Sequence, residues 1–405
     1  MLLFAKLGVT IGDAKASTEI WNWRGAGSTK CCLFCKNVVV VSSGLHTHNP
    51  YFLPSTSADV ASFDLHTDAT VQACVRELVA ARGNMTATKF KELQQALGWT
   101  DHAYSIVLDP RLDVEGPIGV TMWDWMHCFV VSGVFNNRVG LLMSRLHGLG
   151  VGKNRLSWAE VHSYLKLWKW PGRIAARSAT GVECFGPKRA NSSRTAGTFK
   201  ATASEGLSIY PVLRSFFVDV VLPTGQLTVE CKCFDSLCAI LDMLQLVPRG
   251  VVSPPILCAA LRGYLGSFVH AYGEEAALPK DHLALHLPAQ LLAHGTLLSC
   301  WVHERKHRLV KRYGDHMCAT HSGFETSIVE EVVCSQLLHM SNPELMPISQ
   351  PGLVNARPAN KTVMIAVRQH YPWADEILAA KTARIDDYSA CSQLDVVRLD
   401  NGLVG

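Results

Sequence analysis

The stretch HLALHLPAQLLAHGTLLSCWVHERKH, residues 282–307, contains two pairs of histidines at helical spacing. In the first pair, His282 and His286 are four residues apart, so one face of a helix can bring both imidazoles to one metal ion. The second pair belongs to HERKH, residues 303–307, which has the H-E-x-x-H form of zinc peptidases. The choice between the two pairs decides the fold, because the first pair needs further ligands from a distant part of the chain.

The composition is that of a globular protein rather than a disordered one. The chain has 405 residues, of which 48% are hydrophobic and 18% charged, so it can bury a large core and form two or three domains. The net charge of +4 permits a nucleic-acid partner without requiring one. The fourteen cysteines follow no regular framework, which favours reduced, intracellular cysteines. No apolar run approaches the length of a membrane span, so we expect no membrane partner.

A second candidate metal-binding motif lies near the start of the chain. Cys32 and Cys35 form a C-x-x-C after a glycine-rich turn, and two thiolates at this spacing can share one tetrahedral Zn²⁺. Taken alone, the Cys pair is explained equally well as two ordinary reduced cysteines, and the His pair as two hydrogen-bonded helix histidines. Combined with His282 and His286, however, they make a Cys₂His₂ set, which is a closed structural zinc site. Such a site would join the start of the chain to residues 282–286.

Two acidic residues are candidates for catalytic metal ligands. Asp13 follows an apolar segment, residues 2–11, that predicts a buried strand, and a carboxylate at a strand end is held rigidly. The alternative role for Asp13 is the N-cap of the next helix. Glu304 begins a predicted helix rich in cations, which suits phosphate contacts or else forms a solvated face. These cations are Arg305, Lys306, Arg308, Lys311 and Arg312.

Asp124 and His127 lie three residues apart in a strongly apolar segment, residues 121–148, which predicts a buried helix or a broken pair of helices. Buried ionisable groups need partners, so we expect these two side chains to bond each other or a neighbour. They are candidates for structural or active-site support. The polar, basic stretch 186–206 predicts a loop.

These motifs, in this order, resemble those of the cut-and-paste DDE transposases of the CACTA, Chapaev and Transib groups, to which the catalytic subunit of the V(D)J recombinase is related. The resemblance lies in GDAKASTEIW before CCLFCK, in MWDWMH, in HLALH, and in the Glu-Arg pair of HERKH. It covers roughly residues 3–40, 120–148 and 280–340. It implies a partial α/β ribonuclease-H-like core interrupted by a large, mainly α-helical insertion, so that the protein is helix-rich overall.

The resemblance also implies roles for the candidate residues. Asp13 would be the second catalytic acid and Glu304 the third, both binding Mg²⁺ or Mn²⁺, while the Cys and His pairs would hold a structural zinc. The basic residues after Glu304 would bind DNA, and a homodimer and a nuclear location would follow. The implied divisions are residues 1–40 for the core with the Cys pair, 41–280 for the helical insertion, 281–341 for the His pair and catalytic-Glu helices, and 342–405 for a tail of unclear role.

The first acid of the family should lie on a strand upstream of Asp13, and residues 1–12 contain no carboxylate side chain. We therefore expect an inactive fragment or degenerate copy of a transposase. One alternative is a non-catalytic, zinc-stabilised DNA- or protein-binding remnant. The other is a zinc peptidase, with His303 and His307 as ligands, Glu304 as the base and Glu325 or Glu330 as third ligand. Arg305 and Lys306 argue against the peptidase, because a buried active-site helix rarely contains two cations at these positions.

Overall fold

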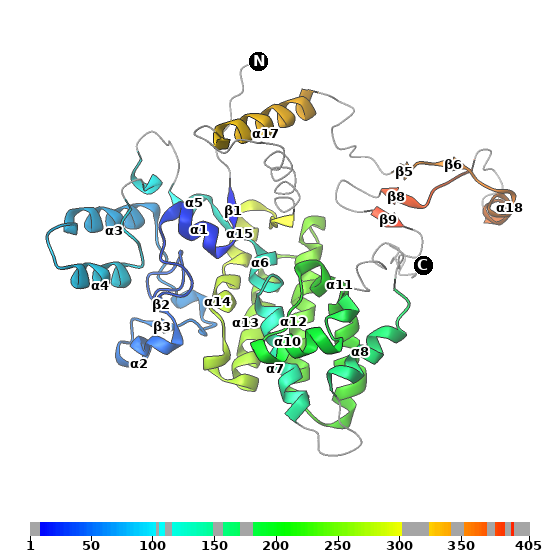
Figure 1. Cartoon of the computed structure of the whole chain (residues 1–405), viewed down its shortest axis with the longest axis horizontal. Coiled ribbons are helices and arrows are strands. Elements are labelled where there is room, and N and C mark those ends of the chain that lie inside the picture. Colours follow the sequence, from blue (N-terminus) through cyan, green and yellow to red (C-terminus); the bar gives the residue numbers. More distant parts are fainter. Residues whose placement is uncertain are drawn as a thin grey trace. The chain divides into compact units, whose positions relative to one another are not determined.

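The computed structural model describes residues 9–102, 105–109, 116–148, 157–170, 181–301, 324–341, 352–370, 377–384 and 390–392. Most of these residues are helical, and the strands are short (Figure 1). The helix-rich character predicted from the sequence is therefore confirmed. The chain divides into two compact units. The first comprises Met1–Lys166 and Gly181–Trp301, and the second comprises Leu167–Thr180 and Val302–Gly405.

A pair of parallel strands lies in the first unit. β1 (Thr10–Gly12) pairs with β4 (Thr121–Trp123), with Gly12 opposite Trp123. An aspartate follows each strand directly and caps the next helix, Asp13 for α1 (Ala14–Trp21) and Asp124 for α6 (Trp125–Phe129). Parallel strands end at the same edge of a sheet, so the two aspartates leave the pair at one edge. β4 falls within residues 121–148, for which the apolar pattern predicted helix only.

The segment between these strands surrounds the Cys pair. It contains a second parallel pair, in which Val38 lies opposite Leu53, and an isolated bridge between Cys35 and Leu65. Its elements are β2 (Val38–Val39), α2 (Leu45–His48), β3 (Leu53–Pro54), α3 (Asp68–Ala81), α4 (Ala87–Leu97), α5 (Pro117–Val120) and the short 3₁₀ helices η1 (Val41–Ser43), η2 (Val60–Ser62) and η3 (Ile106–Leu108).

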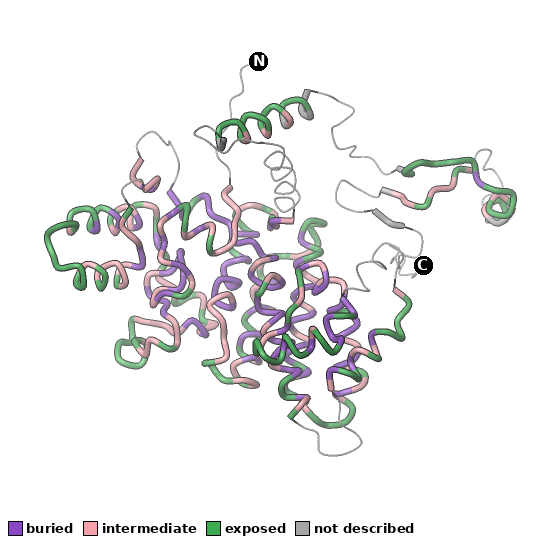
Figure 2. The backbone as a smooth tube through the Cα atoms, in the orientation of Figure 1, coloured by how far each residue is buried: buried purple, intermediate pink, exposed green. Residues whose placement is uncertain are grey.

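The core of the first unit is helical. α12 and α13 are long neighbours that pack against each other, and both contain buried leucines, such as Leu241 of α12 and Leu265 of α13. Figure 2 colours much of this helical part as buried. α7 and α11 pack on α12. The helices of this part are α7 (Val134–Gly148), α8 (Trp158–Leu167), α10 (Pro187–Ala196), α11 (Ala203–Ser215), the π-helical η4 (Phe216–Val221), η5 (Leu222–Thr224), α12 (Thr228–Leu246), η6 (Val247–Arg249), α13 (Pro254–Tyr272) and η7 (Glu274–Ala276).

One helical run, Ala203–Thr224, has the length and apolar composition of a membrane span. Ile209, Leu213 and Phe217 of this run are buried inside the protein, and Arg214 pairs with aspartates of α12. The run therefore packs as a core helix of the unit.

The basic stretch 186–206, predicted as a loop, is helical over Pro187–Ala196 and again from Ala203, and only the segment between them is a loop. Pro187 stands in the first turn of α10, and Gly197, with φ +65°, ends it. The segment after Gly197 runs close to α7, since a Cβ on Gly140 would lie 2.9 Å from the Cα of Thr198. Only glycine allows this approach.

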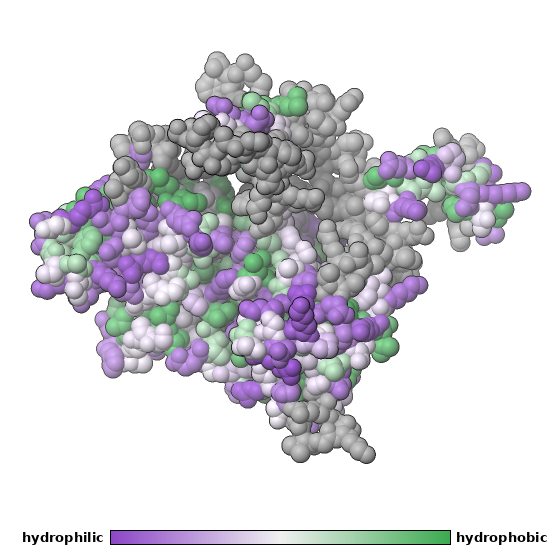
Figure 3. All heavy atoms as spheres, viewed as in Figure 1, coloured by the Kyte–Doolittle hydropathy of each residue, from purple (hydrophilic) through white to green (hydrophobic). Residues whose placement is uncertain are grey.

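The second unit contains α17 (Phe324–Ser341) and two small antiparallel sheets, and many of its described side chains are exposed (Figure 2). One sheet has the order β5-β8-β9 and the other pairs β6 with β7. On the face drawn in Figure 3, hydrophilic and apolar side chains are interspersed. The remaining bounds are β5 (Gly352–Val354), β6 (Arg357–Pro358), α18 (Lys361–His370), β7 (Leu378–Ala379), β8 (Thr382–Arg384) and β9 (Ala390–Ser392).

Candidate metal centre

Four predicted zinc ligands, Cys32, Cys35, His282 and His286, lie together in the first unit and are called the Cys–His cluster below. Cys32 Sγ lies 3.2 Å from His286 Nε2, and Cys35 Sγ lies 3.4 Å from the Nε2 atoms of both histidines. The two Nε2 atoms are 3.3 Å apart. All four side chains are buried, and their ligand atoms lie within 4.8 Å of one another.

These distances fit the edges of a zinc coordination tetrahedron. Zn–S bonds of ~2.3 Å and Zn–N bonds of ~2.0 Å place neighbouring sulfur and nitrogen ligands ~3.6 Å apart and two nitrogens ~3.3 Å apart. The cluster can therefore hold a metal such as zinc without large movement. Four protein ligands leave no open position, so a metal here has a structural role.

The protonation of the two thiols favours a cation. Burial raises the pKa of Cys32, but the hydrogen bond with Cys35 and the charges of His286 and His282 outweigh it, and the pKa lies well below its usual range. The same hydrogen bond, and then burial, raise the pKa of Cys35. The two thiols therefore interact, and charge on one opposes charge on the other. A divalent ion stabilises both thiolates.

Local backbone structure positions the Cys pair. The backbone N–H of Phe34 donates to Cys32 Sγ over 3.3 Å, so the C-x-x-C segment forms a tight turn around the Cys32 sulfur. The N–H of His66 donates to the carbonyl of Phe34, and the bridge between Cys35 and Leu65 fixes the other side. Both thiols therefore face inward.

The His pair lies at a helix break, not on one face of a continuous helix as its spacing predicted. His282 belongs to α14 (Pro279–Ala284), while His286 is the N-cap of α15 (Leu287–His294). The N–H of His286 donates to the carbonyl of Leu283, three residues back, so the chain tightens between the helices. Pro288 has no N–H to bond the carbonyl of Ala284, where α14 ends, so one continuous helix cannot pass this point. The Nε2 atoms still converge on the thiols.

Aromatic rings enclose the cluster. The ring of Phe63 lies 4.9 Å from that of His282, and the ring of Phe34 lies 5.2 Å from that of His286. Burial lowers the pKa of His282, which favours the neutral imidazole that a metal requires. His282 Nδ1 is buried without a hydrogen-bond partner in the described part of the chain. The hydrogen bond that commonly orients a ligand histidine through its second nitrogen is therefore absent among the described residues.

A buried ion pair anchors the His pair from behind. Arg138 of α7 donates through Nη2 to both carboxylate oxygens of Asp281, at 2.5 and 2.6 Å, and through Nε to the hydroxyl of Tyr264 at 2.7 Å. The two charged side chains are 2% and 1% exposed, so the pair is removed from water. Asp281 also accepts from the N–H of Leu278. This contact fixes α14 one residue before His282.

Gln290 of α15 joins the His pair to the strand pair. Its Oε1 accepts from the N–H of Trp123 at 3.1 Å, and its Nε2 donates to the carbonyl of Thr121 at 3.3 Å. The Gln290 side chain therefore makes the backbone hydrogen bonds that a neighbouring strand would make at this edge of β4. The ring of Trp123 packs edge-on against Phe34, so β4 and the cluster share one core.

Asp13, the predicted second acid, acts as the N-cap of α1. Its Oδ1 accepts from the N–H of Ala16 at 2.6 Å, and the residue is partly exposed. The carboxylate is held at the end of β1, as predicted, but its position is fully explained by capping. A capping carboxylate keeps its second oxygen available for another ligand.

Asp124 and His127 bond each other, as expected for buried ionisable groups. His127 Nδ1 contacts Asp124 Oδ2, and Asp124 Oδ1 accepts from the N–H of Met126 at 3.0 Å. Both residues are at the start of α6, beside the edge where Asp13 also lies.

Several predicted residues lie outside the described part of the chain. They are His303, Glu304, Arg305, Lys306, His307, Arg308, Lys311 and Arg312. The side chain of Glu325 lies outside it as well, and Glu330 is exposed on α17. The catalytic Glu304 and the peptidase ligands therefore stay predictions.

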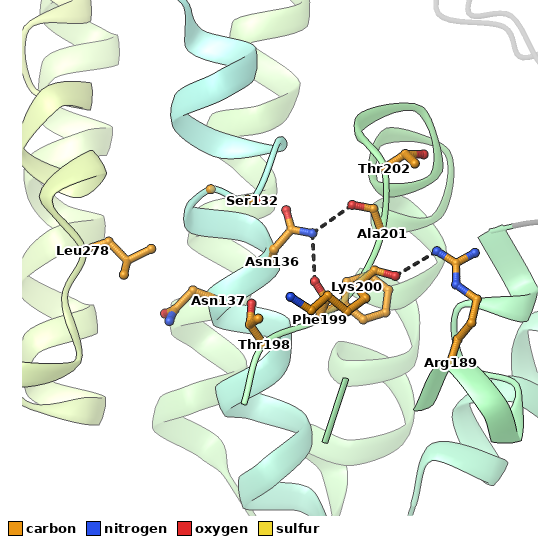
Figure 4. A pocket seen from close by; sticks show the side chains of 11 residues that line it. Ser132, Asn136, Asn137, Arg189, Thr198, Phe199, Lys200, Ala201, Thr202 and Leu278 are labelled. Carbon is orange, nitrogen blue, oxygen red and sulfur yellow. Dashed lines mark hydrogen bonds between the residues drawn. The ribbon is translucent and has the colours of Figure 1, made fainter. Parts of the chain in front are cut away.

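A cavity of about 480 Å³ lies in the helical part, between α7 and the segment that follows α10 (Figure 4). Asn136 Nδ2 donates to the carbonyls of Phe199 and Ala201, and Arg189 donates to the carbonyl of Lys200 (Figure 4). None of the residues lining this cavity is acidic. It suits an anion better than a metal ion.

Arg138, Asp281 and Gln290 were not predicted from the sequence. An arginine within the apolar segment 121–148 signals a buried partner, and Asp281 stands two residues after Pro279 where a capping acid is common. Gln290 carries no comparable signal. The chain matches no protein-family model, no curated protein and no solved structure.

Proposed function

We propose that the chain is a zinc-stabilised relative of the cut-and-paste DDE transposases and that it binds DNA. The observation that carries the proposal is the convergence of the Cys pair and the His pair across most of the chain. The family resemblance requires this convergence, whereas unrelated cysteines and histidines would have no reason to meet with tetrahedral spacing.

The strand pair adds support for a ribonuclease-H-like core. Such a core needs parallel strands that end at one edge with acidic residues, and β1 and β4 are parallel and are followed by Asp13 and Asp124. The proposed insertion, residues 41–280, includes β4 as well as most of the helices. In a relative that carries all three acids, two Mg²⁺ or Mn²⁺ ions held by them would activate water or a 3′-hydroxyl at a DNA phosphate.

A basic surface supports DNA as the partner. Residues 186–202 contain four cations and no acid, and Lys188, Arg194 and Lys200 are exposed. Proteins bind DNA chiefly through such contacts to phosphates, and each contact adds to the salt dependence of binding. The cations that follow Glu304 would extend the same property.

The test is DNA binding by the full zinc-loaded chain as salt is varied. Replacing Lys188, Arg194 and Lys200 by glutamine should weaken binding to all sequences and reduce the salt slope by roughly 0.9 for each lost phosphate contact. The matched control replaces Arg76, Lys89 and Lys91, three exposed cations of α3 and α4. Binding that does not depend on salt, or equal losses in both variants, would contradict the proposal.

A second candidate is a zinc-stabilised binding protein without catalysis, which the capping role of Asp13 favours. The two candidates differ in one measurement, Mn²⁺-dependent nicking of supercoiled DNA. Nicking that Asp13→Asn abolishes supports catalysis, whereas DNA binding without nicking supports the second candidate. The peptidase alternative draws no support from the described residues, because His303, Glu304 and His307 lie outside them.

A further inference from the structure

We propose that Asp124, His127 and Cys300 form a second site, for a divalent transition-metal ion such as Zn²⁺. A carboxylate oxygen, an imidazole nitrogen and a thiol sulfur from these residues lie within 4.8 Å of one another. Asp124 is 1% exposed and Cys300 is 6% exposed. The site is separate from the Cys–His cluster and shares none of its residues.

The fold brings the three ligands together from both sides of the strand pair. Asp124 directly follows β4, and His127 lies one helical turn later. Cys300 lies in the segment after α15. The N–H of Leu298 in this segment donates to Met122 Sδ of β4 at 3.3 Å and so holds the segment beside β4. Because Asp124 Oδ1 is occupied by the N–H of Met126, Oδ2 is the oxygen that faces the imidazole.

The charged groups around the proposed site also favour binding of a divalent cation. Lys280 Nζ donates to the carbonyls of His127 and Val131, at 2.8 and 2.9 Å, and its ammonium interacts with the charges of Asp13 and Asp124. Before a metal binds, the two aspartates carry two negative charges and Lys280 carries one positive charge. A divalent ion that displaces the thiol proton of Cys300 to solvent adds one positive charge in net terms and balances this difference.

The donor set selects the metal. One thiolate, one imidazole and one carboxylate suit Zn²⁺ or Co²⁺, whereas Mg²⁺ and Mn²⁺ prefer oxygen ligands. The described residues supply three ligands, so a fourth position stays for water, an anionic oxygen or a further ligand. The proposed site differs from the Cys–His cluster in its thiolate count and in its carboxylate ligand.

Metal analysis of the full chain tests the inference directly. After purification with excess zinc and buffer exchange, the wild type should retain two zinc ions per chain. Cys300→Ala should retain one, and the control Cys258→Ala, a half-buried cysteine of α13, should retain two. A wild type with one zinc, or a Cys300→Ala variant with two, overturns the inference.

Cobalt substitution identifies which site is lost and shows whether the fold persists. Cobalt titration of the wild type should proceed in two phases, and Cys300→Ala and His127→Gln should each lose one phase while keeping the thiolate-to-cobalt band of the Cys–His cluster. A single phase in the wild type contradicts the second site. DNA binding measured in parallel separates this inference from the proposed function, since a chain with two metals that fails to bind DNA overturns only the latter.

Discussion

Cys32 and His286 are 254 positions apart in the chain, yet Cys32 Sγ lies 3.2 Å from His286 Nε2. No local structure explains this contact, because the two residues belong to segments joined only by the helical part of the protein. A metal at this point closes a very long loop, and its binding energy becomes part of the folding energy.

Removal of metal should therefore lower stability. If zinc is present at ~1,000 times its dissociation constant, it contributes ~4 kcal/mol to folding. Thermal unfolding should shift to lower temperature when a strong chelator is added or when Cys35 is replaced by serine. Cys258→Ser is the matched control and should unfold like the wild type. A Cys35→Ser variant with unchanged zinc content and unfolding temperature would show that the cluster is not a metal site.

The buried pair of Arg138 and Asp281 should respond asymmetrically to substitution. Arg138→Met leaves the Asp281 carboxylate without its partner, and loss of one member of such a pair costs roughly 3–5 kcal/mol. Arg138→Met combined with Asp281→Leu removes both charges and should recover part of that loss. Urea unfolding of the two variants measures the difference. A double variant less stable than the single one would mean that the guanidinium is not held chiefly by Asp281.

The same pair should also control zinc retention, because Asp281 immediately precedes His282. Zinc release to a chromogenic chelator at a temperature where all variants are folded should be faster in Arg138→Met than in the wild type. Arg145→Met, which removes a largely exposed cation from the same helix, provides the control.

The Cys–His cluster could be predicted because its chemistry is explicit in the sequence. Each pair has a spacing that brings two ligands to one ion, and few residues other than cysteine and histidine supply such ligands. The break between Ala284 and Leu287 was not predicted, although Pro288, which has no N–H for the carbonyl of Ala284, signalled it. The two imidazoles still converge on the thiols, because a short tight turn advances the chain by a distance per residue close to that of an α-helix.

Other features could not be read from local patterns. Residues 121–123 form a strand, but a short apolar strand and a buried helix have the same hydrophobic pattern. Residues 187–196 form a helix despite weak intrinsic preference, and tertiary contacts such as Arg189 with Glu205 account for it. Gln290 at the edge of β4 depends on tertiary structure alone.

The ion pair of Glu205 with Arg189 should make the free energy of unfolding depend on pH. The hydrogen bond from Arg189 holds the pKa of Glu205 at about 2, below its usual 4.5. A carboxylate with a lowered folded pKa stabilises the protein above the unfolded pKa and loses this contribution as pH falls toward the folded value. Wild type should therefore exceed Glu205→Gln in stability at pH 7. The difference should shrink below about pH 4.5 and vanish near pH 2, and a difference independent of pH would contradict the ion pair.

Substitutions at Asp13 separate its capping role from any catalytic role. Asp13→Ala removes the acceptor for the N–H of Ala16 and should destabilise the protein by about 1 kcal/mol, whereas Asp13→Asn keeps a capping oxygen and should cost little. Denaturant unfolding of both variants measures this contrast. If Asp13 also binds a catalytic metal, Asp13→Asn should lose Mn²⁺-dependent nicking while unfolding like the wild type. Equal destabilisation by both substitutions would show that the carboxylate charge, rather than the cap, holds the end of β1 in place.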